Sequence, residues 1–258
     1  MADRSYTETL VLLDRKGLKY STVFDIGSAD GHFFVEHYAY GLFRGGAKPV
    51  NIDPNPVYEP TLRAIQEGLG GHYLLAATSD AAGEVVLTDS QHPYWSSLRP
   101  PDDSYWKRIN KLSTESMTVP ARRLDDIAEE LQLQGPYLIK LDVQGAELAT
   151  LRGAPKVLAE TSVVICEADV EDFQAINAEL VAAGFILFDI TVLNYLADQS
   201  LGWFYPVYIH SRFKDLLETQ IWRQESNQLA IQNQAERRRK VLLRVSDLLA
   251  KLKSGAIK

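Results

Sequence analysis

Apolar and polar residues alternate along most of this chain in a way that predicts strands and helices in turn. After residue 20, short apolar runs rich in Val, Ile, Leu and Phe are separated by stretches with helical spacing. The apolar runs predict strands near 22–26, 48–53, 71–77, 136–142, 162–167, 184–190 and 203–210. The helical stretches fall near 31–43, 57–68, 123–132, 145–152, 171–183 and from about 213 onward. This order is typical of an α/β fold with a mostly parallel, seven-stranded sheet and helices on both faces.

Residues 83–122 interrupt this alternation. Strands are predicted near 83–87 and 116–119, as partners of each other. The stretch between them, QHPYWSSLRPPDDSYW, is rich in Pro, Ser and aromatic residues, which is typical of a loop. Long loops in compact domains often carry function, so we expect its part from Tyr94 to Leu98 to face a ligand. The alternative is that its aromatic side chains only cover a sheet edge.

The C-terminal segment, residues 213–258, differs from the domain predicted for residues 1–212. Its apolar residues recur in steps of four and three between Leu217 and Leu252, as in the seam of a coiled coil. Lys and Arg outnumber Asp and Glu in this segment, whereas the rest of the chain is acidic and the total net charge is −7. We therefore expect a long basic helix that allows homo-oligomers to form. A helix folded back on its own domain is the alternative that stays open.

Composition limits the class of protein. The chain has 258 residues, of which 46% are hydrophobic and 24% charged, which suits one large α/β domain. No stretch reaches the ~18 consecutive apolar residues of a membrane span, and the charged N-terminus does not resemble a signal peptide. The acidic domain argues against nucleic acid as the main substrate. The one cysteine, Cys166, excludes an internal disulfide, so we expect a buried thiol and a cytoplasmic location.

The most informative stretch runs from the first predicted strand to the second. Asp25 ends the first strand and opens a turn with Gly27 and Gly31, and Asp53 ends the second strand. Glycine lets backbone N–H groups approach a ligand closely, and an acid at the second strand end can accept both hydroxyls of a ribose. The pattern therefore indicates half of a nucleotide-binding βαβ unit. The alternatives are a purely structural glycine turn and an acid that only caps the next helix.

The same turn argues against a dinucleotide. It lacks the close G-x-G pair that lets the backbone approach a pyrophosphate. Asp25 would also repel a pyrophosphate, but it suits a cationic ligand. These features disfavour a dinucleotide-dependent oxidoreductase, which stays open as an alternative.

Carboxylates also end two later strands. Lys140 and Asp142 lie in one predicted strand and point the same way, so each can neutralise the other. Glu147 lies one helical turn further on, and Glu167 ends the next strand. Neighbouring parallel strands bring their carboxyl ends to one edge, so we expect these acids to meet there. The alternative is that Lys140 and Asp142 form an ion pair that only closes the core.

Taken in order, several motifs resemble a known family. DIGSADG, IDPNP, AATSDAAGE, ARRLDDIAEEL, IKLDVQGAELATLRGA and VVICEAD follow one another over residues 20–210 as in the FkbM family of S-adenosylmethionine-dependent methyltransferases. The resemblance implies a Rossmann-like class I methyltransferase fold. The chain departs from the family pattern at Ser28 and Ala29, where Ala and Asn are usual, and at Asp53 and Gln144, where Glu is common. The glutamine removes a negative charge from the predicted acidic edge.

The resemblance also implies roles for individual residues. The turn after the first strand would hold the methionine part of S-adenosylmethionine, with its amine near Asp25 and with His32 facing the cofactor. Asp53 would accept the ribose hydroxyls, residues 76–80 would cover the adenine, and Asp142 would border the sulfonium and the acceptor. The expected cofactor-binding residues are Asp25, Gly27, Ser28, Gly31, His32, Asp53, Pro54, Thr78, Ser79 and Asp142.

An oxygen acceptor also needs a base. We expect Asp142 and Glu167 to be the catalytic residues, with His92 and His210 as alternatives. The resemblance implies an oxygen of a sugar, a glycan or a secondary metabolite as the acceptor. A divalent ion held by Asp142, Glu147 or Glu167 stays open but is not favoured, because the sequence does not show that these acids converge. The remaining alternative is a non-catalytic assembly module that recruits partners through its C-terminal segment.

Overall fold

A computed structural model of the protein describes residues 5–43, 45–89, 96–98 and 115–216. The chain divides into two compact units, Met1–Lys214 and Asp215–Lys258. The second unit lies almost entirely outside the described residues, so the coiled coil and the self-association expected there stay predictions. The first unit holds the sheet and the candidate site.

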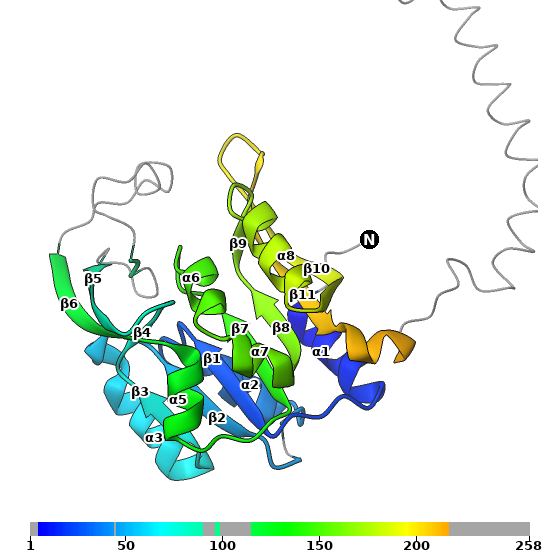
Figure 1. The fold of residues 1–258 in the computed structure, drawn as a ribbon, viewed down its shortest axis with the longest axis horizontal. Helices are drawn as coiled ribbons and strands as arrows, with labels where there is room; N and C mark the ends of the chain where they lie inside the picture. The colour runs from blue at the N-terminus through cyan, green and yellow to red at the C-terminus, as the bar shows by residue number, and fades with distance from the viewer. Residues whose placement is uncertain (1–4, 44, 90–95, 99–114, 217–258) are drawn as a thin grey trace, which may run out of the picture. The chain divides into compact units, whose positions relative to one another are not determined.

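A mostly parallel sheet forms the centre of the first unit (Figure 1). Of its eight strands, seven follow the order β10-β11-β8-β7-β1-β2-β3, and the short β9 pairs with β11. The bounds are β1 Thr22–Ile26, β2 Lys48–Ile52, β3 His72–Leu74, β7 Tyr137–Leu141, β8 Thr161–Cys166, β9 Ala168–Asp169, β10 Phe185–Tyr195 and β11 Leu201–His210. Strands β10 and β11 pair with each other and β11 pairs with β8 in antiparallel fashion. The predicted α/β fold with a mostly parallel sheet is confirmed, and the short β9 is an eighth strand beyond the seven that were predicted.

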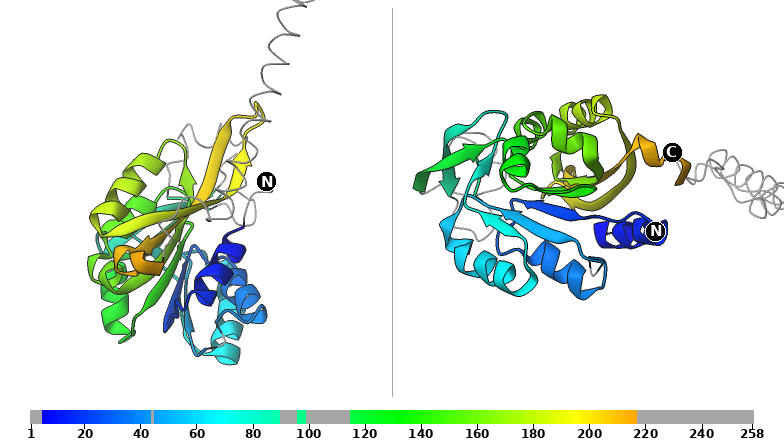
Figure 2. Two further views of the ribbon diagram at one scale, coloured as in Figure 1. Left: turned by 90° about the vertical axis from the view of Figure 1, so that its right-hand side faces the viewer. Right: turned by 60° about the horizontal axis from the view of Figure 1, so that its bottom comes forward.

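Helices cover both faces of this sheet. In Figure 2 (right), α1, α2 and α3 lie on one side of the strands and the helices from α5 to α8 on the other. The α-helices are α1 Tyr6–Arg15, α2 His32–Ala39, α3 Glu59–Leu69, α5 Leu124–Glu130, α6 Glu147–Arg152, α7 Pro155–Glu160 and α8 Phe173–Ala182, and two 3₁₀ helices are η1 Pro56–Tyr58 and η2 Ser211–Leu216. Within the described ranges, none of these helices has the length and apolar character needed to cross a bilayer.

Helix α1 lies in a part of the chain for which the strand and helix pattern predicted no element. Its start is fixed by a capping box, in which the Ser5 hydroxyl accepts the N–H of Glu8 and the Glu8 carboxylate accepts the N–H of Ser5. Leu10 and Leu13, one turn apart, are buried. The helix therefore packs on the sheet through one apolar side.

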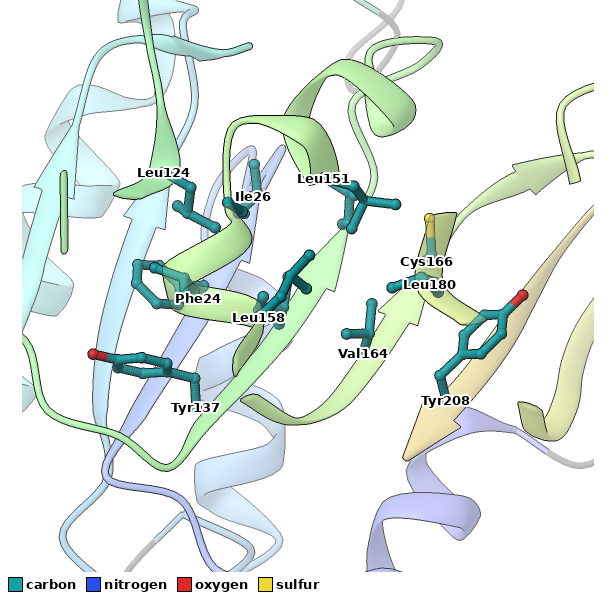
Figure 3. Packing of buried hydrophobic residues seen from close by; sticks show 14 of the residues in the cluster. Phe24, Ile26, Leu124, Tyr137, Leu151, Leu158, Val164, Cys166, Leu180 and Tyr208 are labelled. Carbon is teal, nitrogen blue, oxygen red and sulfur yellow. The ribbon is translucent and has the colours of Figure 1, made fainter. Parts of the chain in front are cut away.

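The core on the α5–α8 side decides where the polar residues of the strands point. Phe24 and Ile26 of β1 and Val164 and Cys166 of β8 are fully or almost fully buried there, with Leu158 of α7 (Figure 3). The thiol of Cys166 is buried, as predicted. Because side chains alternate along a strand, the residues between these positions point to the opposite face, which α1 and α2 cover.

The strand predicted at 71–77 is in fact two strands in two sheets, so that prediction was wrong. The chain leaves the main sheet after Leu74, and β4 (Ala77–Thr78) pairs with β6 (Glu115–Arg122). Strand β6 pairs in antiparallel fashion with β5 (Gly83–Asp89), which confirms the pairing predicted for 83–87 and 116–119. The second sheet has the order β4-β6-β5. Ala77 and Thr78 pair with β6 instead of with a strand of the main sheet. Both residues are buried in this position.

Candidate active site

A cavity of about 280 Å³ opens at the edge of the main sheet where the parallel strands end. It spans the carboxyl ends of β2, β1, β7 and β8, which lie side by side in that order, and it reaches β11. Its polar and aromatic lining residues include His32, Asp53, Tyr58, Thr78, Ser96, Lys140, Asp142, Gln144, Glu167, Trp203 and Tyr205. Open α/β sheets bind their ligands at this edge, so the cavity is the candidate active site.

The turn after β1 is held tightly between the two neighbouring strands. Gly27 and Ser28 donate their backbone N–H groups to the carbonyl oxygen of Ile52, at 2.9 and 3.2 Å. The φ of Gly27 is +71°, and a Cβ atom there would lie 1.7 Å from the carbonyl oxygen of Asp142. Packing against the end of β7 therefore requires glycine at this position. Gly27 lines the cavity, whereas Ser28 is buried and does not.

Asp53 ties this turn to the end of β2. Its Oδ2 accepts the N–H of Ala29 at 2.8 Å, and its Oδ1 accepts the N–H of Asn55 at 2.9 Å. Burial raises the pKa of Asp53 to about 6, although both N–H groups favour the charged form. Asp53 and Pro54 also line the cavity. One side chain thus organises the loop and faces the space in which a ligand would bind.

Lys140 is a buried cation below the cavity, at the centre of the sheet. Its Nζ lies 3.3 Å from Oδ2 of Asp142 and 3.5 Å from Oδ1 of Asp25, and it donates to the carbonyl oxygen of Gly27 at 3.1 Å. Burial works against its charge, but the two carboxylates outweigh that effect and raise the pKa of Lys140 above its ordinary value. The predicted pairing of Lys140 with Asp142 is present.

Asp25 lies deeper than the sequence suggested. It is fully buried and faces Lys140 across the β1–β7 register, and it does not line the cavity. Burial raises the pKa of Asp25, against the attraction of Lys140. The geometry therefore makes Asp25 a partner of the lysine under the turn and gives no sign of direct contact with a ligand.

Asp142 and Glu167 form a pair of carboxylates that share two donors. The side-chain Nε2 of Gln144 donates to Oδ1 of Asp142 at 2.8 Å and to Oε2 of Glu167 at 2.6 Å. The hydroxyl of Tyr205 lies 2.9 Å from Oδ2 of Asp142 and 3.3 Å from Oε1 of Glu167. All four residues line the cavity. The sequence predicted that acids at the strand ends meet at one edge of the sheet, and Asp142 and Glu167 do so.

The two carboxylates differ in their protonation. Burial raises the pKa of Glu167 well above its usual range, and the charge of Asp142 adds to that. Burial acts on Asp142 in the same direction, but Lys140 and the hydrogen bonds from its neighbours bring the pKa of Asp142 below its ordinary value. Glu167 is therefore the member of the pair that holds a proton more tightly, and Asp142 is the member that ionises more readily.

Glu147 is turned away from this pair. Its carboxylate accepts the N–H groups of Val143 at 3.0 Å and Gly145 at 2.9 Å, at the start of α6, and it does not line the cavity. Burial raises its pKa to about 7. Among the described residues, no group of three or more His, Cys, Asp or Glu side chains is placed to hold a metal ion.

Most of the predicted cofactor-binding residues meet at the cavity. Those that line it are Gly27, His32, Asp53, Pro54, Thr78 and Asp142. Those that do not are Asp25, Ser28, Gly31 and Ser79. The Ser79 hydroxyl instead donates to the carboxylate of Asp80, at 3.2 Å. Of the alternative bases, His210 packs against the ring of Phe185 at the far end of β11, and His92 lies outside the described residues.

The loop after β5 reaches the cavity through its described part. Ser96 and Leu98 line it, and the hydroxyl of Ser97 donates to the backbone carbonyl of Gln144. The aromatic residues just before Ser96 lie outside the described part of the chain. Their expected contact with an acceptor therefore stays a prediction.

The family of the chain follows from its match to known proteins. A model of the FkbM methyltransferase domain matches residues 25–187, which is more than half of the chain. The chain belongs to the FkbM methyltransferase family. The resemblance found in the motifs is thus confirmed, and the matched range includes the ends of β1, β2, β7 and β8 that form the cavity.

This FkbM-family chain also has structural neighbours. Precorrin-6y C5,15-methyltransferase from Geobacter metallireducens is 14% identical, with 79% of this chain and 87% of that chain covered and a TM-score of 0.42. Aeropyrum pernix fibrillarin, in complex with natively bound S-adenosyl-L-methionine, is 12% identical, with 79% and 74% covered and a TM-score of 0.42. A Streptococcus thermophilus rRNA methylase is 11% identical, with 81% and 98% covered and a TM-score of 0.42. No curated protein sequence matches this chain.

Two cavity residues that the sequence reasoning missed lie outside the FkbM range. Trp203 and Tyr205 come from β11, where they alternate with buried Phe204. Because β11 is antiparallel to β8, its first half lies at the carboxyl edge of the parallel strands. The alternating aromatic residues in WFYPVY, in the last predicted strand, were the available signal.

Proposed function

We propose that this protein is an S-adenosylmethionine-dependent O-methyltransferase. The observation that carries the proposal is that one cavity presents Asp53 at the end of β2 and the pair of Asp142 and Glu167 at the ends of β7 and β8. Membership of the FkbM family supports methyl transfer. An acid on one side suits a ribose, and an ionised acid on the other suits an acceptor that loses a proton.

The proposed binding roles follow the strand order. Asp53 would accept the ribose hydroxyls with the lone pairs that its two N–H partners leave free, and Thr78 would border the adenine. His32 and Gly27 would border the methionine part. Asp25 acts indirectly, since its contact with Lys140 supports the turn from below. S-adenosylmethionine, when bound, supplies the methyl group together with its own leaving group.

The proposed chemistry depends on alignment and on one proton. Holding the two reactants in line in a closed site can lower a barrier by ~7–11 kcal/mol. Asp142, kept ionised by Lys140, accepts the proton that the acceptor hydroxyl loses. Trp203 lines the same cavity as the two carboxyl groups, and this combination suits a ring that carries several hydroxyls, with the indole against its C–H face. We therefore propose an oxygen of a sugar, a glycan or a hydroxylated secondary metabolite as the acceptor.

A donor labelled in its methyl group tests this function directly. Wild-type protein is incubated with labelled S-adenosylmethionine and a panel of sugars, glycans and hydroxylated metabolites, and transfer to oxygen is identified by mass spectrometry. Asp142→Asn is expected to lower transfer at least ~100-fold. It is expected to leave binding of S-adenosylhomocysteine within a few-fold, because the shape of the site is kept. Asp198→Asn, in the loop between β10 and β11 and outside the cavity, is the matched control.

Two outcomes would overturn the proposal. If calorimetry shows binding of NAD but not of S-adenosylmethionine, the donor is wrong. If Asp142→Asn transfers methyl groups as fast as the control, the proposed base is wrong.

A cytoplasmic location and the exclusion of nucleic acid as a partner rest on composition alone and stay predictions.

A further inference from the structure

Tyr205 is the residue of β11 that contacts both carboxyl groups of the pair. Its hydroxyl lies within 3.3 Å of both carboxyl groups, at 2.9 Å from Asp142 and 3.3 Å from Glu167. It lies outside the range of the family match. Its position at the cavity depends on the antiparallel pairing of β11 with β8 and β9.

The N-terminal helix holds the ring of Tyr205 in place. The ring of Tyr6, in the first turn of α1, lies 5.6 Å from it between centroids, at an angle of 56°. Helix α1 is itself fixed by a hydrogen bond from Thr9 to Asp189 of β10, at 2.7 Å, and by one between Thr7 and His37, at 3.0 Å. The phenol is therefore positioned by two elements that lie outside the FkbM range.

The two groups that bridge the carboxylates differ in what they can do with a proton. The Nε2 of Gln144 only donates, and it uses one hydrogen for each carboxylate. A phenol can donate one hydrogen and accept another at the same time. With one proton on the pair, Glu167 can donate to the oxygen of Tyr205 while Tyr205 donates to Asp142.

We propose that Tyr205 joins Asp142 and Glu167 into one proton-sharing unit and passes to Glu167 the proton that Asp142 collects during methyl transfer. The inference rests on the proposed function, and it makes Tyr205 a proton relay that affects the reaction through Asp142. It goes beyond the pair itself, because it assigns the route by which the base is restored after each turnover.

The proton balance is closed. When a C–O bond to the methyl group replaces its C–S bond, the electron pair of the broken bond stays on sulfur and the acceptor proton goes to Asp142. Glu167, which lines the cavity, then releases its own proton to water. Asp142 passes its proton to the oxygen of Tyr205, and the hydroxyl hydrogen of Tyr205 moves to Glu167. One proton has left the site, and the pair is back in its starting state.

Several charged or titratable groups lie around this unit and act on it electrostatically, and they define what a titration will report. They are Lys140 of β7 and Asp25 of β1 beneath Asp142, Glu147 of α6, Cys166 of β8 and Tyr6 of α1. None of these groups is changed in the variants below. A difference between variants therefore reports on the phenol alone.

The test is a titration of Glu167 by ¹³C NMR in the full chain labelled at its glutamate carboxyl carbons. Tyr205→Phe is compared with Tyr208→Phe, which removes a phenol from the same strand but one that bonds Asn177, at 3.2 Å. In the wild type, ionising Glu167 costs the hydrogen bond that its protonated carboxyl donates to Tyr205. Tyr205→Phe has no such bond to lose, so Glu167 ionises more easily there. The upper midpoint of the pair is therefore expected to fall by about one pH unit in Tyr205→Phe only.

A second measurement needs no substitution. In protein labelled with ¹³C at the ζ carbon of its tyrosines, the resonance of Tyr205 is expected to shift with the same midpoint as Glu167, while that of Tyr208 stays constant. Unshifted Glu167 in a folded Tyr205→Phe, or a Tyr205 resonance that ignores the Glu167 midpoint, overturns the relay. Calorimetry of S-adenosylhomocysteine on the same samples separates this failure from that of the proposed function, which fails if the ligand does not bind.

Discussion

Replacing Asp53 with alanine tests the cofactor side of the site. In the wild type, the carboxylate accepts the N–H of Ala29 at 2.8 Å and the N–H of Asn55 at 2.9 Å, and it borders the cavity. Asp53→Ala removes the proposed partner of the ribose and also leaves both N–H groups without the acceptor that they have in the wild type. The variant is therefore expected to bind S-adenosylmethionine and S-adenosylhomocysteine more weakly and to be less stable.

The magnitude follows from the contacts. A polar group that loses its partner in a buried site costs ~1–3 kcal/mol, so the loss of the ribose contact is expected to weaken binding about 5- to 150-fold. Each of the two backbone N–H groups adds a cost to folding in the same range, although water from the cavity can offset part of it. Folding is thus expected to lose more free energy than binding does.

Calorimetry with S-adenosylhomocysteine gives the binding term, and denaturant unfolding gives the folding term. Asp198→Ala is the control, since Asp198 lies in the loop between β10 and β11 and does not line the cavity. The pKa of about 6 adds a second check: the wild type should lose affinity as the pH falls below about 6, because Asp53 becomes protonated, and the alanine variant should not. Equal affinity of Asp53→Ala and Asp198→Ala would refute the ribose assignment.

Three further variants test the site and its scaffold. Gln144→Glu puts a third carboxylate against two others, so we expect a lower melting temperature at pH 8 that millimolar Mg²⁺ restores; a temperature unchanged without Mg²⁺ would contradict the bridging role. Gly27→Ala is expected not to fold, because its Cβ would meet the carbonyl oxygen of Asp142 at 1.7 Å, whereas Gly17→Ala, also at positive φ but with open space, should fold; circular dichroism of both decides. Glu147 binds its proton more tightly in the folded state, with a pKa of about 7 against 4.5, so its part of the stability is lost as the pH rises from about 4.5 to about 7. The unfolding free energy of Glu147→Gln, measured by urea unfolding, should therefore fall less steeply over that range, by up to ~1.4 kcal/mol per pH unit. If the wild type and the variant show the same dependence on pH, the raised pKa of Glu147 is wrong.

The central strands could be predicted from the sequence because their apolar runs are continuous and bounded by clear breaks. The strands that hold Asp25 and Lys140 are predicted to within a residue or two of their observed bounds. The β3–β4 break was not predictable in this way, because residues 71–77 read as one run and the split depends on pairing with a strand some 40 positions later. Helix α1 was missed although Ser5 and Glu8 carry a capping-box signal.

The candidate site was predictable only as far as strand ends reveal it. Asp53, Asp142 and Glu167 follow apolar runs, and parallel order brings such positions to one edge. The burial of Asp25 could not be predicted in this way. It depends on the packing of Phe24 and Ile26 into the core on one face of the sheet, which turns Asp25 to the other face, beside Lys140. Tyr205 was missed because its place depends on the antiparallel register of β11, which the sequence does not fix on its own.

The strand order has a consequence for synthesis of the chain. Strand β1 is made early, but its second neighbour, β7, is made only after the whole of the second sheet. While the ribosome extends the chain from Ile52 to Tyr137, one side of the central strand has no partner, and such unpaired edges attract other chains. During this interval Asp25 also lacks its ion-pair partner, because Lys140 has not yet been synthesised. A chaperone that shields the nascent chain at this stage would therefore raise the yield of folded protein.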